Sequence, residues 1–232
     1  MSLEGLFKKV DISLKNNHFL NALRHIAEIR EKYPFNKRVD QFILLNKKKY
    51  LEKTNIGHEI NNLQKEINND NFITKLNQLL KLEPQNAYLH GILGDHHGIN
   101  LNFRQAKIYQ EKAISLNPFE EVFYINLSKS LSSLKLYENS LKVLKLSKVL
   151  KPKDFEINLL MARCLIKLLK YKAAFDVYNE LILIDSNNIE ISLEFCKYLL
   201  DFKETDKAIE ILDKINSKKD YLNEITMLYG VA

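Results

Sequence analysis

Tryptophan is absent from the 232 residues, and residues that break helices are scarce, with only 6 glycines and 4 prolines. So few breakers favour long helices joined by short turns. Hydrophobic residues make up 46% of the chain, which is enough for a continuous core and argues against disorder. No run approaches the roughly 18 apolar residues of a membrane span, and the first residues lack the order of a secretory signal. We therefore expect a helical protein with no membrane partner.

Cysteine is almost as scarce as tryptophan. The two cysteines, Cys164 and Cys196, form no CxxC motif and lie in apolar stretches of sequence. This setting is typical of small, reduced core residues rather than of metal ligands or disulfides. On this ground we expect a cytoplasmic protein.

Catalytic signatures are missing as well. No Ser/His/Asp or Cys/His arrangement stands out. Gly91, Gly94 and Gly98 lie inside a predicted helix with no preceding strand, so they do not form a phosphate-binding loop. We predict that the residues shown do not form an enzyme and hold no cofactor. We expect these glycines either to pack closely against another helix or to form a smooth patch on the inner wall of the fold.

Four polar residues on the same predicted helix suggest a metal site: His90, Asp95, His96 and His97. Side chains that share an ion on one helix face need spacings of three or four, whereas His90 and His97 are seven residues apart. We favour packing over metal binding for both histidines and predict no metal.

The chain does contain a period of 34 residues. Leu82-Glu83-Pro84 recurs as Leu116-Asn117-Pro118 and as Leu150-Lys151-Pro152. A period of this size is typical of stacked helical hairpins. Pro34 lies 50 residues before Pro84, which is one period of 34 residues plus 16. We place it at the same position of the repeat and assign the 16 additional residues to one extra helix and a short link.

Small residues recur at fixed offsets within each period. Small side chains at these offsets allow two helices to approach closely, because a large side chain would overpack the contact. The pairs are Gly94 and Ala106, Ser128 and Ser140, Ala162 and Ala174, and Cys196 and Ala208.

These residues resemble the tetratricopeptide repeat (TPR), which combines a Leu-Gly pair, an aromatic residue, two small alanines and a terminal proline. The resemblance covers residues 3–36 and 53–222 and is strongest over 87–188. His90, His97 and Gln110 depart from it, since they stand where aromatic residues are usual. It implies an all-α fold: an α-solenoid of stacked antiparallel helix-turn-helix hairpins that forms a right-handed superhelix with a concave groove.

We expect two domains. Residues 1–52 hold a TPR-like hairpin, with its turn at Asn16-Asn17, and one extra basic helix over 37–51. Residues 53–232 hold the array, with repeats at about 53–86, 87–120, 121–154, 155–188 and 189–222 and a partial repeat over 223–232. Because the last unit stops within a helix, we expect the natural chain to continue past Ala232.

The excess of positive charge lies in the first of these domains. The net charge is +6, and residues 1–53 hold 12 Lys and Arg against 6 Asp and Glu, so the other 23 of each sign cancel. Segment 37–53, with Phe42 and Tyr50, could attract nucleic acid. We favour a solvated helix face and hence no nucleic-acid partner. The acids Glu120 and Glu121, at an inter-repeat turn, are likewise expected to be solvated.

The resemblance implies a protein or peptide ligand in the groove lined by the first helix of each hairpin. Asn126 matches one slot of the carboxylate clamp of heat-shock co-chaperones, but Asp95 and Glu156 would repel a C-terminal carboxylate. We therefore predict a protein-binding scaffold or adaptor without that clamp. Its groove residues are Tyr88, Ile92, Asp95, Val122, Ile125, Asn126, Lys129, Leu160, Arg163, Glu194 and Lys197.

An alternative is the non-catalytic N-terminal, substrate-presenting module of a larger enzyme. The closure of the first hairpin, Lys32-Tyr33-Pro34-Phe35-Asn36-Lys37-Arg38, and the link after the extra helix are similar to the start of certain bacterial proteins. In those proteins TPR repeats precede a sulfotransferase, a glycosyltransferase or an iron/2-oxoglutarate oxygenase.

Overall fold

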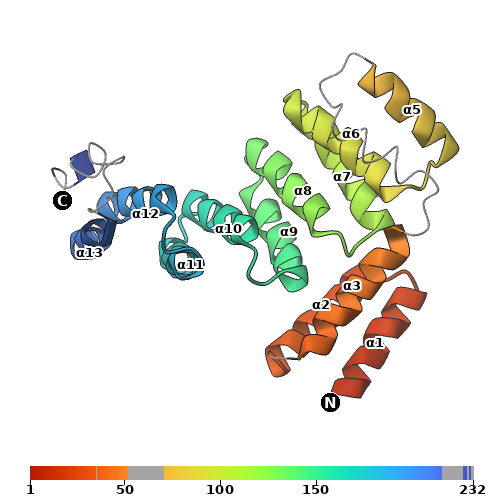
Figure 1. The fold of residues 1–232 in the computed structure, drawn as a ribbon, viewed down its shortest axis with the longest axis horizontal. Coiled ribbons are helices and arrows are strands. Elements are labelled where there is room, and N and C mark those ends of the chain that lie inside the picture. Colours follow the sequence, from red (N-terminus) through yellow and green to blue (C-terminus); the bar gives the residue numbers. More distant parts are fainter. Residues whose placement is uncertain (35, 52–70, 216–226, 229, 231–232) are drawn as a thin grey trace. The chain divides into compact units, whose positions relative to one another are not determined.

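A computed structural model describes residues 1–34, 36–51, 71–215, 227–228 and 230, and every regular element in these ranges is an α-helix (Figure 1). The chain forms two compact units, Met1–Ile157 and Asn158–Ala232. No described helix is long and apolar enough to cross a membrane. The first helix expected for repeat 53–86 and most of the partial repeat 223–232 lie outside the described residues.

The helices form the antiparallel hairpins that the 34-residue period predicts. In the first unit they are α1 (Leu3–Lys15), α2 (Phe19–Lys32), α3 (Lys37–Leu51), α5 (Phe72–Leu82), α6 (Ala87–Ile99), α7 (Phe103–Leu116), α8 (Glu121–Ser133) and α9 (Tyr137–Leu150). Then follow α10 (Phe155–Lys167), which crosses into the second unit, and α11 (Tyr171–Ile184), α12 (Ile189–Asp201) and α13 (Thr205–Ile215). Within the first unit, hairpin α6–α7 stacks on hairpin α8–α9. The fold is an all-α solenoid of helical hairpins.

One left-handed residue fixes the turn inside each of five hairpins. Leu101, Lys135, Leu169 and Lys203 have φ between 59° and 61° and follow one another at intervals of 34 residues, and Asn17 has φ 56°. In each turn the next residue donates its N–H to the carbonyl five residues before it, with N···O distances of 2.8–2.9 Å. This is the Schellman motif, which satisfies carbonyls at a helix end. The predicted turn at Asn16-Asn17 is confirmed.

Small residues bring the two helices of a hairpin together, as predicted. Ser140 Oγ donates to the backbone oxygen of Ser128 over 3.0 Å, and both residues are fully buried. In the same slots of the second unit, Cys196 Sγ donates to the oxygen of Ala208 over 3.7 Å. Burial raises the pKa of the Cys196 thiol to about 12, so it behaves as a small core residue.

Two of the three glycines of α6 are required for close contacts. A Cβ atom at Gly91 would lie 2.4 Å from Cε1 of Phe123, and one at Gly94 would lie 2.6 Å from Nε2 of Gln110. At Gly98 the nearest atom, Cβ of Ala106, would be 4.0 Å away, which is an ordinary distance. The predicted close packing is therefore confirmed at Gly91 and Gly94, whereas Gly98 has room for a side chain.

The N-terminal hairpin packs against helix α9 of the array. Helix α2 contacts α9, and the buried core of α1–α3 includes Phe119, Tyr124 and Leu150. The ring of Phe42 in α3 lies 6.3 Å from that of Phe119. Val39 and Ile43 of the extra helix are buried in the same core, while the side chain of Tyr50 lies outside the described part. Among the described residues, this hairpin thus contacts a repeat that is not the next one in the sequence.

Substituting the glycines of α6 by alanine tests how closely these helices pack. Gly91→Ala forces a shift of Phe123, so we expect it to lower the free energy of unfolding by about 1–3 kcal/mol. Gly98→Ala is the matched control: it meets no close neighbour and should raise stability by about 0.5–1 kcal/mol, because alanine loses less entropy in a helix. Urea denaturation followed by circular dichroism measures both. Equal effects of the two substitutions would contradict the packing that we describe.

Candidate functional site

The first helices α6 and α8 lie in contact and form one face of the first unit. We call it the first-helix face and define it by Tyr88, Asp95, Val122, Asn126 and Lys129. Val122 is 44% exposed and the Lys129 side chain 51% exposed, whereas the other three are partly buried. The structure thus places five of the predicted groove residues together on one accessible surface.

Two predicted groove residues of α6 and α8 are almost completely buried. Ile92 is only 3% exposed and Ile125 only 5% exposed. Both lie on first helices, where stacking of adjacent hairpins removes the apolar positions from solvent. Both therefore pack between helices instead of being exposed as predicted, and Ile92 also borders the cavity described below.

Asp95 is held by two amide groups that donate to the same carboxylate oxygen. Gln110 Nε2 and Asn126 Nδ2 each lie 2.6 Å from Oδ1 of Asp95. Gln110 also donates to the backbone oxygen of Gly91 over 3.0 Å, and its amide occupies the space that a side chain at Gly94 would fill. In the described part of the chain no donor lies within hydrogen-bond distance of the second oxygen, Oδ2. One oxygen of this carboxylate is therefore fixed and the other is open.

The charge of Asp95 has no paired cation among the described residues. Its nearest cationic influence is Lys129, whose ammonium group is bound to Glu156 over 2.6 Å. Burial raises the pKa of Asp95 to about 6, although the two amides and Lys129 act in the opposite direction. A partly buried carboxyl group with a raised pKa is a candidate for a functional position.

A cavity of about 140 Å³ lies beside Asp95. Its lining includes the acids Asp95 and Glu120 and the aromatic residues Tyr88 and Phe123, whose ring centroids are 5.6 Å apart. Because the lining residue Val122 is 44% exposed, the cavity borders on the surface. The complete lining is Tyr88, Gly91, Ile92, Asp95, Glu120, Val122 and Phe123.

In the second unit the residues at the equivalent positions of the repeat also contact each other, but they form an ion pair instead of an amide hydrogen bond. Arg163 Nη2 and Nε bind the two oxygens of Glu194 over 2.6 and 2.9 Å, and Tyr178 donates to the same carboxylate over 2.6 Å. Arg163 and Glu194 are 31 residues apart, as are Asp95 and Asn126. Lys197 is exposed and Leu160 is partly buried. Two of the four groove residues predicted here are thus already bound to each other.

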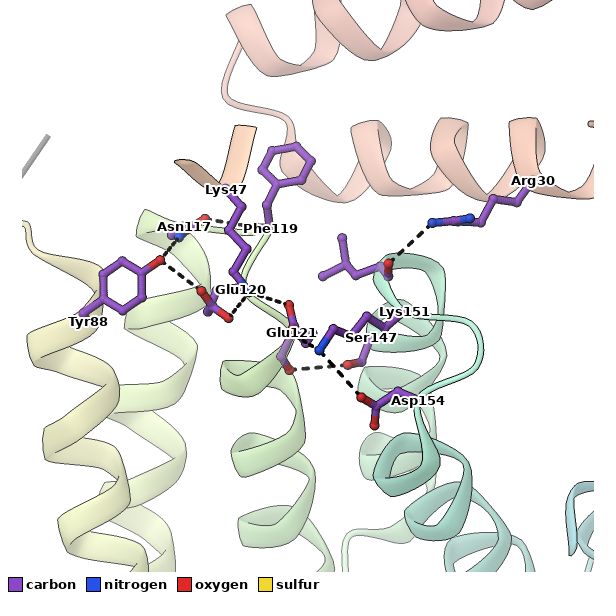
Figure 2. A network of polar contacts seen from close by, with 11 residues as sticks. Arg30, Lys47, Tyr88, Asn117, Phe119, Glu120, Glu121, Ser147, Lys151 and Asp154 are labelled. Carbon is purple, nitrogen blue, oxygen red and sulfur yellow. Dashed lines mark hydrogen bonds and ion pairs between the residues drawn. The ribbon is translucent and has the colours of Figure 1, made fainter. Parts of the chain in front are cut away.

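Glu120 and Glu121 are buried, with exposed fractions of 6% and 5%, so their expected solvation is wrong. Lys47 of α3 binds Glu120 over 2.7 Å and Glu121 over 3.0 Å, and Lys151 binds Glu121 over 2.7 Å (Figure 2). Burial opposes ionisation of Glu121, but Lys151 and Lys47 hold the pKa of its carboxyl group below the usual range. The acids can be buried because two lysines compensate their charge.

Figure 2 shows that this ion network continues on both sides. On one side Tyr88 of the first-helix face donates to Glu120 over 2.9 Å. On the other side Arg30 donates to the backbone oxygens of Val149 and Leu150 over 2.7 and 3.4 Å. Those carbonyls end helix α9, where a cation is favourable. The network therefore links the N-terminal hairpin, the array and the cavity.

The histidines of α6 pack against aromatic rings. The rings of His90 and His97 are stacked on Tyr109 at 6.3 and 5.3 Å, and His96 lies 5.2 Å from Phe72. Burial lowers the pKa of His97, and His96 adds to this effect. Within the described ranges no group of three or more His, Cys, Asp or Glu side chains could hold a metal ion.

The basic segment 37–53 is partly used inside the protein. Lys47 is paired with Glu120 and Glu121, Arg38 is paired with Glu4, and Phe42 packs between Phe7 and Phe119. The aromatic side chain and two of the cations that a nucleic acid would need are therefore engaged in the fold.

Sequence reasoning missed the two residues that organise the site. Gln110 departs from the repeat pattern at an aromatic slot, and this departure was the available signal for a polar contact inside the array. For Lys47 the sequence contains no such signal. Its partners Glu120 and Glu121 lie 73 and 74 residues away, and the helix that carries Lys47 is not part of the 34-residue repeat.

The fold is that of TPR proteins. MamA matches with a TM-score of 0.61 at 15% identity, over 67% of this chain and 91% of MamA. The C-terminal part of a TPR repeat-containing protein from Cytophaga hutchinsonii matches with a TM-score of 0.60 at 17% identity, over 94% and 98%. YrrB, a TPR protein with an unusual peptide-binding site, matches with a TM-score of 0.58 at 18% identity, over 87% and 96%. Neither the protein-family models nor the curated proteins contain a match.

Removing Lys47 should expose the cost of burying two acids. We expect Lys47→Met to lower the free energy of unfolding by about 1–3 kcal/mol, since Glu120 and Glu121 lose a charged donor while remaining buried. Lys48→Met, an exposed neighbour on the same helix, should change it by less than about 0.5 kcal/mol. Thermal and urea unfolding of both variants provide the measurement. An effect of Lys47→Met no larger than that of Lys48→Met would contradict the network.

The raised pKa of Asp95 predicts a pH dependence of stability. The folded state holds its proton up to about pH 6, whereas the unfolded state loses it near pH 4. Stability from this group is therefore present below about pH 4 and falls as pH rises to about 6. The difference in the free energy of unfolding between Asp95→Asn and wild type should therefore shift by about 1–3 kcal/mol in favour of the variant between pH 4 and pH 7.5. Urea denaturation at both pH values measures the difference, and a gain that does not change with pH would contradict the assignment.

Proposed function

We propose that this protein is a scaffold or adaptor that binds a protein or peptide segment along the first-helix face. The observation that carries the proposal is the cavity beside Asp95, which lies between α6 and α8 next to the exposed side chains of Val122 and Lys129. The face combines a cavity lined by aromatic residues with charged and apolar side chains, which is a composition typical of binding sites.

The stacking of the hairpins supports this role physically. Gly91, Gly94 and the hydrogen bonds of Gln110 fix α6 against its neighbours before any ligand binds. A preformed surface of this kind loses little conformational entropy on binding. YrrB has a similar fold and a peptide-binding site, which supports a peptide ligand for this chain by analogy.

The proposal also includes the four predicted groove residues of the second unit. Leu160, Arg163, Glu194 and Lys197 lie on the first helices α10 and α12 of the second unit, and we propose that they form a binding surface of that unit. The scaffold acts without catalysis and in the cytoplasm. The alternative of a substrate-presenting module before an enzyme domain stays a prediction from the sequence.

The experiment is selection of random 12-residue peptides displayed on phage against the whole chain. We expect the double variant Val122→Glu and Lys129→Glu to bind the selected peptides at least tenfold more weakly, because it replaces an apolar and a cationic side chain of the first-helix face by acids. Ile108→Glu with Lys112→Glu changes two exposed residues of the second helix α7 in the same way and serves as the control.

Isothermal titration calorimetry of the selected peptides gives the affinities. Circular dichroism shows that both double variants fold. Failure to select any peptide, or equal affinities of the two double variants, would overturn the proposal that the first-helix face binds peptides.

A further inference from the structure

We propose that the cavity beside Asp95 holds the side chain of a lysine from the bound segment, with its ammonium group against Oδ2 of Asp95. This inference rests on the proposed peptide-binding function and specifies the partner's chemistry. It concerns the first unit alone, where all residues of the cavity lie.

The size of the cavity favours a single side chain. Its volume of about 140 Å³ is below the range of about 300–1,000 Å³ that is typical of pockets for small molecules. A segment that lies along the first-helix face would therefore place one side chain in it, while the rest of the segment contacts the exposed surface around Val122.

The charges around the cavity favour a cation. Two carboxylates line it, but only one of them is compensated. Glu120 is bound to Lys47 over 2.7 Å and accepts a hydrogen bond from Tyr88 over 2.9 Å. In the part of the chain that the structure describes, Asp95 has only the two amides of Gln110 and Asn126, and its partial burial makes an unpaired charge unfavourable. A ligand cation would supply the missing partner.

The hydrogen bonds of Asp95 favour lysine over arginine. Oδ1 already accepts two hydrogen bonds, one for each of its lone pairs, so Oδ2 is the oxygen that remains for a ligand. The guanidinium group of arginine is matched to both oxygens of a carboxylate, whereas the ammonium group of lysine binds as a point charge. One open oxygen fits the second geometry.

The apolar walls fit the rest of a lysine side chain. Ile92 and the rings of Tyr88 and Phe123 border the cavity, and lysine packs its aliphatic stem on apolar surface while its charge binds a polar group. The two rings also attract a cation. Lys129 on the same face does not compete for Asp95, because Glu156 binds its ammonium group over 2.6 Å.

The test uses arrays of 12-residue peptides that share one fixed central residue and have equimolar mixtures at the flanking positions. The central residue is lysine, norleucine, arginine or glutamate, and the probe is the fluorescently labelled full chain. We expect at least fivefold more binding to the lysine array than to the norleucine array, with the arginine array between them and the glutamate array lowest.

Two variants with the same change of charge show where this preference arises. Asp95→Asn should bring the ratio of lysine to norleucine binding close to one, because the open carboxylate oxygen is lost. Glu111→Gln removes an exposed acid of α7 that pairs with Lys107, lies outside the first-helix face and does not contact Lys129, so it should leave the ratio unchanged. Circular dichroism of both variants shows that they fold.

The outcomes separate the two proposals. If none of the arrays binds, the peptide-binding function itself is overturned, and this inference with it. If the lysine and norleucine arrays bind equally well, or if Glu111→Gln abolishes the preference as strongly as Asp95→Asn, the lysine site is overturned while peptide binding stands. Equal binding of the arginine and lysine arrays would overturn the single-oxygen geometry.

Discussion

The close approach of α6 to its neighbours is the constraint on which the site depends. Because Gly91 and Gly94 have no side chains, the ring of Phe123 and the amide of Gln110 occupy the space where Cβ atoms would otherwise lie. That ring becomes a wall of the cavity, and that amide becomes one of the two donors to Asp95. The slots that pack hairpins together therefore also shape the surface that we propose for binding.

The 34-residue period predicted most of the array, because each helix and turn repeats a local rule. The left-handed residues at Leu101, Lys135, Leu169 and Lys203 follow this period although none is a glycine. The ion pairs of Lys47 could not be predicted in the same way. The extra helix α3 lies outside the repeat, and its contact with Glu120 and Glu121 depends on how the N-terminal hairpin meets α9, which no local pattern specifies.

Slot positions alone also did not decide which groove residues face solvent. Ile92 and Asn126 occupy equivalent slots in successive repeats, yet Ile92 is buried and Asn126 reaches Asp95 of the preceding first helix. In the second unit Glu194 stands in that same slot and binds Arg163. The register of 31 residues brings these slots together, but the side chains that occupy them decide whether the contact is apolar, an amide hydrogen bond or an ion pair.

Asp95 illustrates why a stability cost can accompany a binding site. Where opposite charges meet on the first helices, as in Lys129 with Glu156, the pair neutralises itself and offers a ligand little. Asp95 instead has its charge oriented by two neutral amides, and these fix Oδ1 while leaving Oδ2 open. A cation that arrives there meets a carboxylate already held in place, so little reorganisation opposes binding. Burial of the same unpaired carboxyl group raises its pKa in the free protein, which links its weak contribution to stability to its availability for a partner.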